Sequence, residues 1–221
     1  MFNFKIIFIV LLLNSIQANA IVLTGNTEGT FEKSNASLLE WGAPFFLDDG
    51  IQSSLEYTGI NNFSVEDGEH FIIGHLAYTN GEIGGETSFT KTVVDDNGFN
   101  LGVGFTSPVN GLFEFNFEVS LDETKNVGNI HHNSDRMTLT AAADFNPLFS
   151  LNADEYSFQL LGFERSPDSG EYDNFLTLQE INVGDKPIAV YAKISAVPVP
   201  SAIWLFITAL SGFFISSKRR V

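Results

Sequence analysis

The stretch FEFNFEVSLD, residues 113–122, decides the fold class because apolar and polar side chains alternate in it without exception. The apolar positions are Phe113, Phe115, Phe117, Val119 and Leu121, and the polar positions are Glu114, Asn116, Glu118, Ser120 and Asp122. Successive side chains of a β-strand point to opposite faces, so one face packs on a core and the other meets water. The stretch therefore predicts an antiparallel strand with a buried side and a solvated side.

Shorter stretches of the same character recur along the chain, separated by turn-forming residues. The predicted strands are 54–57, 71–78, 87–94, 136–142, 156–163, 175–181 and 188–194. The predicted turns are Asn80-Gly81, Gly84-Gly85, Asp96-Asn97-Gly98, Asn110-Gly111, Ser169-Gly170 and Gly184-Asp185. This spacing favours one all-β domain over 21–196, an antiparallel, jelly-roll-like β-sandwich, with a small barrel as the alternative. Residues 124–135 and 164–172 are predicted to be exposed loops, where binding residues commonly lie.

The charge between the two ends of the chain is strongly negative. All 27 Asp and Glu lie within 21–196, whereas four of the 11 Lys and Arg lie outside it, so seven cations remain and the net charge is −20. Nucleic-acid binding relies on Lys and Arg at phosphates, so we expect no nucleic-acid partner. The sequence has no Cys, which excludes thiol catalysis, zinc–thiolate sites and iron–sulfur clusters.

The N-terminus, residues 1–20, has the pattern of a secretory signal peptide. Lys5 precedes the apolar run 6–13, and the small residues Ala18 and Ala20 stand at positions −3 and −1 of a cleavage site after Ala20. The apolar run is far shorter than the roughly 20 residues that span a bilayer. We therefore expect the export machinery to remove this segment, with an uncleaved anchor as the alternative.

The C-terminus, residues 197–221, has the pattern of a short membrane segment. Pro198 and Pro200 disfavour helix, and the residues 202–215 that follow are almost all apolar. A helix over those positions is roughly 21 Å long, against about 30 Å of hydrocarbon, and it extends at most to about residue 217. The positive-inside rule keeps Lys218, Arg219 and Arg220 cytoplasmic, so the body between the two segments is predicted to lie outside the cell.

The same C-terminal residues resemble a known sorting signal. Val197-Pro198-Val199-Pro200-Ser201-Ala202, then Trp204-Leu205-Phe206 and the basic end, resemble the PEP-CTERM signal. The resemblance implies that an exosortase-type membrane enzyme cleaves near the Pro-x-Pro motif and sorts the exported protein. The middle residue of the motif is usually Glu in that family and is Val199 here. A permanently membrane-anchored surface protein is the alternative.

A second resemblance covers most of 21–196. Its stretches, in order, are Gly29-Thr30-Phe31, SSLEYTGINNFSV, FIIGHLAYTNGEIGGET, FEFNFEVSLDETKN, YSFQLLGF and KPIAVYAKISAV. In that order, and directly before the sorting signal, they look like the choice-of-anchor K domain. The resemblance implies a bacterial extracellular domain joined to a surface-anchoring signal, and it brings no catalytic residues.

The candidate metal ligands of this sequence are His and acidic residues. His131 and His132 are adjacent, and His70 and His75 are five apart, so on a strand each pair is predicted to face opposite ways. Acidic residues beside Gly suggest loop tips that could hold calcium. These are Asp48-Asp49-Gly50, Glu66-Asp67-Gly68-Glu69, Asp95-Asp96-Asn97-Gly98 and Glu171-Tyr172-Asp173-Asn174. Turns use the same residues. We expect no cofactor, with calcium at Asp95, Asp96, Asp48 or Asp49 as the alternative.

No catalytic motif is evident, so the function predicted from the sequence is not enzymatic. We expect an exported component of the cell surface or of an extracellular polysaccharide matrix. A secreted glycan hydrolase, which would use a carboxylate pair, is the alternative from a different class. Sugar-binding sites use exposed aromatic rings, and the candidates by residue type are Trp41, Tyr57, Tyr78, Tyr156, Tyr172 and Tyr191.

Overall fold

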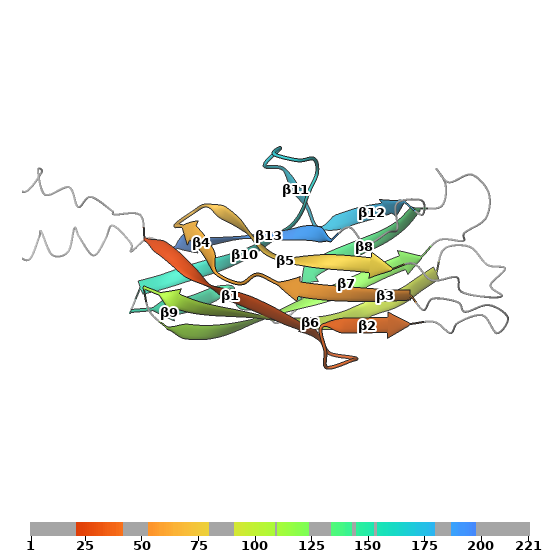
Figure 1. Ribbon diagram of the computed structural model, residues 1–221, viewed down its shortest axis with the longest axis horizontal. Coiled ribbons are helices and arrows are strands. Elements are labelled where there is room, and N and C mark those ends of the chain that lie inside the picture. Colours follow the sequence, from red (N-terminus) through yellow and green to blue (C-terminus); the bar gives the residue numbers. More distant parts are fainter. Residues whose placement is uncertain are drawn as a thin grey trace, which may run out of the picture.

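The computed structural model describes residues 21–41, 53–79, 91–108, 110–123, 134–142, 145–152, 154–179 and 187–197. Within these residues the protein is all-β, with antiparallel strands arranged as two sheets (Figure 1). The strands are β1 (Val22–Phe31), β2 (Leu38–Trp41), β3 (Ser53–Gly59), β4 (Phe63–Glu66), β5 (His70–Thr79), β6 (Lys91–Ser107), β7 (Gly111–Glu123), β8 (Ser134–Ala141), β9 (Leu148–Leu151), β10 (Asp154–Glu164), β11 (Tyr172–Asp173), β12 (Phe175–Gln179) and β13 (Ile188–Ala196). The predicted all-β antiparallel class is confirmed.

The strand order explains how distant segments meet. The first sheet has the order β12-β8-β7-β6-β1-β4, and the second has the order β11-β10-β13-β5-β3-β2, with β9 also paired to β10. The chain passes from the second sheet to the first between β11 and β12, because β11 pairs with β10 and β12 pairs with β8. This arrangement of two antiparallel sheets around one apolar core is that of a β-sandwich.

The deciding stretch lies in β7 and behaves as its alternation predicts. Phe115, Phe117, Val119 and Leu121 are buried, and the residues between them are partly or fully exposed. Phe115 of the first sheet stacks on Phe158 of β10 in the second, with 4.2 Å between ring centroids. Aromatic pairs of this kind join the two sheets through the core.

One predicted turn is wrong. Asp96-Asn97-Gly98 lies inside β6, where the register with β7 shifts between Val94 and Asn97. An extra residue of this kind bends a strand without ending it. Asn97 turns inward and is 1 % exposed, and its Oδ1 accepts a hydrogen bond from the Lys33 backbone N–H at 3.3 Å. The prediction that Asp95 and Asp96 form a loop tip is therefore wrong, and their side chains lie outside the described residues.

A buried polar junction links the sheets at β1. Thr27 of β1 donates its backbone N–H to the Ile60 carbonyl at 2.9 Å, and its Oγ1 accepts the Ile60 N–H at 2.8 Å. The same hydroxyl donates to the Ile73 carbonyl of β5, which also accepts the Tyr57 hydroxyl at 2.6 Å. Gly59 is required beside this junction, because a Cβ there would overlap the Thr27 carbonyl. We call these contacts the Thr27 junction.

The two ends of the described body lie side by side. Asp67, in the turn between β4 and β5, donates its N–H to the Ile21 carbonyl at 3.3 Å, and its Oδ1 accepts the Ala196 N–H at 2.6 Å. Gly68 donates to the Ile194 carbonyl in the same turn. Figure 1 shows the start of β1 and the finish of β13 at its left. We call this part of the molecule the Asp67 end.

The terminal segments predicted from the sequence lie outside the described residues. This applies to the signal peptide over 1–20 and to the membrane helix over about 202–217. Among the residues that are described, no helix has the length and apolar character needed to cross a bilayer.

Candidate functional site

Three rings gather on the outer side of the second sheet, and we call them the tyrosine cluster. His70 lies at the start of β5, Tyr172 in β11 and Tyr191 in β13. Ring centroids are 5.1 Å apart between the two tyrosines, and 5.4 and 6.5 Å from His70 to Tyr172 and Tyr191. His70 is exposed, and both tyrosines are half-buried. Sequence positions more than 100 residues apart thus form one surface feature.

A β-bulge determines which side chains of β5 share this surface. Val190 pairs with Gly74 and Tyr191 pairs with Ile72, so Ile73 is an extra residue on β5. The bulge changes the alternation, and both His70 and His75 consequently lie on the side away from the core, with Ile73 and Leu76 buried. The prediction that the two histidines face opposite ways is wrong for this reason.

Polar residues continue the outer surface next to the cluster. Lys193 of β13 is in register with His70 of β5 on one side and with Gln159 of β10 on the other. Lys193 is half-buried and Gln159 is exposed, while the intervening Ala192 and Ile194 are buried. An amide and an ammonium group therefore lie in one row across three strands, beside the rings.

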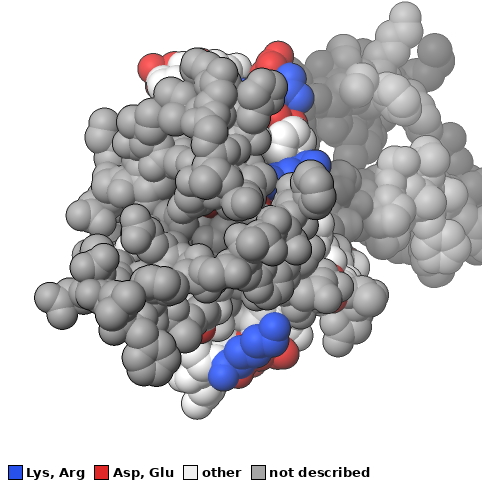
Figure 2. Space-filling model, turned by 90° about the vertical axis from the view of Figure 1, so that its right-hand side faces the viewer, with Lys and Arg blue, Asp and Glu red and all other residues white. Residues whose placement is uncertain are grey.

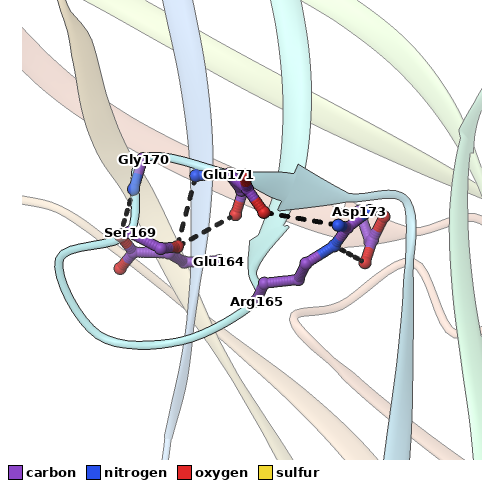
Figure 3. A network of polar contacts seen from close by, with 6 residues as sticks. All are labelled: Glu164, Arg165, Ser169, Gly170, Glu171 and Asp173. Carbon is purple, nitrogen blue, oxygen red and sulfur yellow. Dashed lines mark hydrogen bonds and ion pairs between the residues drawn. The ribbon is translucent and has the colours of Figure 1, made fainter.

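The loop between β10 and β11 is held by one arginine, as Figure 3 shows. Arg165 donates from Nε and Nη2 to the two carboxylate oxygens of Asp173, at 2.8 and 2.9 Å, and from Nη1 to Glu171 at 3.3 Å. This fork geometry suits a carboxylate. The hydrogen bond from Arg165 holds the pKa of Asp173 below its ordinary value.

Glu164 connects this loop to the tyrosine cluster. Its Oε1 accepts the Gly170 N–H at 3.1 Å, and its Oε2 accepts the Tyr191 hydroxyl at 3.3 Å. Burial, and then the Glu164 charge, raise the pKa of both Tyr172 and Tyr191, so both phenols stay neutral. The Tyr172 hydroxyl is buried without a hydrogen-bond partner among the described residues. The loop therefore fixes the rings from one side.

The arrangement offers ring surface and the Gln159 amide, whereas the Tyr172 hydroxyl is buried and the Tyr191 hydroxyl is bonded to Glu164. The carboxylates of the Arg165 loop already accept protein hydrogen bonds. Glycoside hydrolysis requires a proton donor and a second carboxylate in different environments.

The other aromatic candidates lie elsewhere. Tyr57, Tyr78 and Tyr156 are 4, 6 and 2 % exposed and belong to the core, so their candidacy as a sugar platform is wrong. Tyr78 donates to the buried Asp135 carboxylate at 2.8 Å. Trp41 stacks on Tyr78 with 6.1 Å between ring centroids, and it is half-buried. Only Tyr172 and Tyr191, of the six predicted candidates, meet in a surface cluster.

Two of the acidic clusters considered for calcium use their carboxylates within the protein. Asp67 accepts the Ala196 N–H, and Glu171 and Asp173 accept from Arg165. No group of three or more His, Asp or Glu suited to a metal ion occurs among the described side chains. The remaining candidates, Asp48 and Asp49, lie outside the described residues.

The predicted processing residues are described only at Val197. Its N–H donates to the Glu155 carbonyl at 2.8 Å, so Val197 continues the pairing of β13 with β10. Outside the described residues lie Ala18, Ala20, Pro198, Val199, Pro200, Ser201, Lys218, Arg219 and Arg220.

Figure 2 shows how Lys, Arg, Asp and Glu side chains are distributed over one side of the molecule. Its described Lys and Arg side chains are scattered, and acidic side chains lie beside them. They form no continuous basic patch in this view of the described residues.

Sequence reasoning missed Arg165, Glu164 and His70 as parts of one site. A signal existed for the loop, since Arg165 is a lone cation among the acids of ERSPDSGEYD, residues 164–173. Comparison of the chain with protein-family models and with curated proteins finds no match.

Proposed function

We propose that this protein is an exported, non-enzymatic component of the cell surface or of an extracellular polysaccharide matrix, which it contacts through the tyrosine cluster. The observation that carries the proposal is the meeting of Tyr172, Tyr191 and His70 on the outer side of the second sheet. In this proposal the body is a jelly-roll-like domain of the choice-of-anchor K kind. The export machinery and an exosortase-type enzyme act on its two ends.

The position of the ends supports display at a membrane. Ile21 and Ala196 both contact Asp67, so both targeting segments are joined to the Asp67 end of the body. A body tethered there leaves its sheet faces exposed. The tyrosine cluster lies on one of those faces and close to the Asp67 end, because His70 directly follows the turn that contains Asp67.

The ligand we propose is a neutral glycan. The negative net charge of the body disfavours polyanions. Aromatic rings supply flat apolar area, and the exposed Gln159 amide supplies neutral hydrogen-bonding groups. Exposed aromatic residues beside a few polar groups are a common composition of binding surfaces.

Binding is tested by affinity electrophoresis through gels that contain a neutral polysaccharide or none. Substituting Tyr172→Ala together with Tyr191→Ala is expected to abolish retardation. Leu112→Ala, an exposed apolar residue on β7 of the other sheet, is the matched control and is expected to change nothing. Equal retardation of the double variant and the parent would overturn the glycan contact.

Processing is tested by mass spectrometry of the C-terminal peptide from cells and from the medium. We expect a mature C-terminus near Pro198–Pro200 that is absent when the exosortase is deleted. An intact Val221 in the membrane fraction would instead establish the permanently anchored alternative. Release of sugar products, lost on substituting one carboxylate pair, would establish the hydrolase.

A further inference from the structure

A slot of about 490 Å³ opens between β8 of the first sheet and β10 of the second. Phe145 and Phe158 contribute aromatic surface to its lining. Its polar side chains are all uncharged, namely Thr140, Ser157, Gln159 and Asn174. The body carries a net charge of −20, yet none of the described residues that line the slot is charged. The slot is therefore a neutral surface on an acidic protein.

The slot exists because no described strand covers this part of the β10 edge. β9 pairs with β10 from Asp154 to Ser157, and β11 pairs with it again at Phe163 and Glu164. Between them, the Phe158 N–H donates to the Pro147 carbonyl at 2.6 Å. Backbone groups of alternate residues on a strand point to the same edge. The N–H and carbonyl of Leu160 therefore face the same side of β10 as the Phe158 N–H. The uncovered stretch from 159 to 162 is about 13 Å long at roughly 3.3 Å per residue.

The facing edge of β8 is open in the same way. β12 pairs with β8 only as far as Thr138, and Asn174 then accepts one more hydrogen bond, from the Leu139 N–H at 2.8 Å. The Ala142 N–H donates to Asn116 in β7, on the other side of β8. Alternation therefore directs the N–H and carbonyl of Ala141 away from β7, towards the slot that Ala141 lines.

We infer that this slot binds an extended, uncharged polypeptide segment of another protein, which adds as a short strand. The backbone edges supply the hydrogen bonds for strand addition, and the uncharged lining selects against charged side chains. The chain's own β9 and β11 already pair with the same edge of β10, on either side of the gap. A segment of about four residues matches the length left open.

Amide hydrogen exchange on the full-length exported protein tests this directly. The probe is a capped, eight-residue peptide of alternating Thr and Val, and its matched control carries N-methyl groups on alternate amides. We expect at least tenfold slower exchange at Ala141 and Leu160 with the probe, and no change with the control. Equal effects of the two peptides, or none from either, would overturn strand addition.

Two further arms separate the alternatives. Ala141→Pro removes a slot donor without removing a ladder bond to β7, and we expect it to weaken binding of the probe at least tenfold, whereas Ala141→Val is expected to change it less than twofold. Slow exchange at both amides in the free protein would show that the chain's own residues fill the slot. Protection by a neutral oligosaccharide and not by the peptide would show a glycan site instead. Either result overturns the inference.

Discussion

The Thr27 junction gives the sharpest test of how the sheets are held together. Thr27→Val preserves side-chain volume but leaves the Ile60 N–H without its acceptor, while the Ile73 carbonyl keeps the Tyr57 hydroxyl. An unpaired buried donor costs about 1–3 kcal/mol. Burial of the methyl group that replaces the Thr27 hydroxyl offsets about 0.8 kcal/mol of this cost. We expect Thr27→Val to lower the free energy of unfolding by about 1–2 kcal/mol.

The second donor to Ile73 makes the prediction stronger. Tyr57→Phe alone leaves the carbonyl bonded to Thr27 and is expected to cost about 0.5–1.5 kcal/mol. The double variant leaves that carbonyl with neither donor, so its cost should exceed the sum of the single costs by about 1 kcal/mol. Burial raises the pKa of Tyr57 far above its ordinary value, so the phenol remains a donor throughout the neutral range.

The assay is urea unfolding with linear extrapolation, accepting only variants whose m-value is unchanged. Thr30→Val is the matched control, because Thr30 lies on the same strand and is exposed, and we expect a change below about 0.5 kcal/mol. Additive costs in the double variant, or a Thr27→Val variant as stable as the control, would refute the reasoning.

Three further predictions concern other parts of the body. Gly59→Ala should cost about 1–3 kcal/mol in urea unfolding because its Cβ would overlap the Thr27 carbonyl, whereas Gly104→Ala, whose Cβ would make only ordinary van der Waals contacts, should cost clearly less. The lowered pKa of Asp173 means that its contribution to stability is present above its unfolded pKa, near 3.9, and is lost as pH falls through the folded value. Arg165→Met should therefore destabilise the protein more at pH 7 than at acidic pH, where Asp173 becomes protonated; an equal effect at both would contradict the assignment. Dialysis against a chelator should leave the melting temperature unchanged, and a drop that added calcium reverses would show a structural ion.

The strands that could be predicted are those with alternating apolar side chains, such as β7 and β10. β1 was missed because its inward positions include Gly25 and Gly29, where the rings of Phe63, Phe99 and Tyr57 occupy the space a side chain would need. Glycine at an inward position has no apolar side chain, so the strand lacks the alternation of apolar and polar residues by which β7 is recognised.

The tyrosine cluster could be predicted only as residue types. Tyr172 and Tyr191 were candidates together with three tyrosines that proved to be buried, because a ring suits a core and a binding surface equally well. Their meeting with His70 depends on the strand order and on the bulge at Ile73. Neither is encoded in a short window of sequence.

The position of β13 in its sheet has a mechanical consequence. β13 is the strand nearest the C-terminus, and it lies between β10 and β5 rather than at an edge. Force transmitted through the C-terminal segment would load β13 along its axis and shear two ladders at once, because it pairs with both neighbours over most of its length. An edge strand pulled along its axis would shear a single ladder. If the body is tethered through this strand, as proposed, a pull on it would be resisted by both ladders together, and the rate of forced unfolding would set how long the domain withstands it.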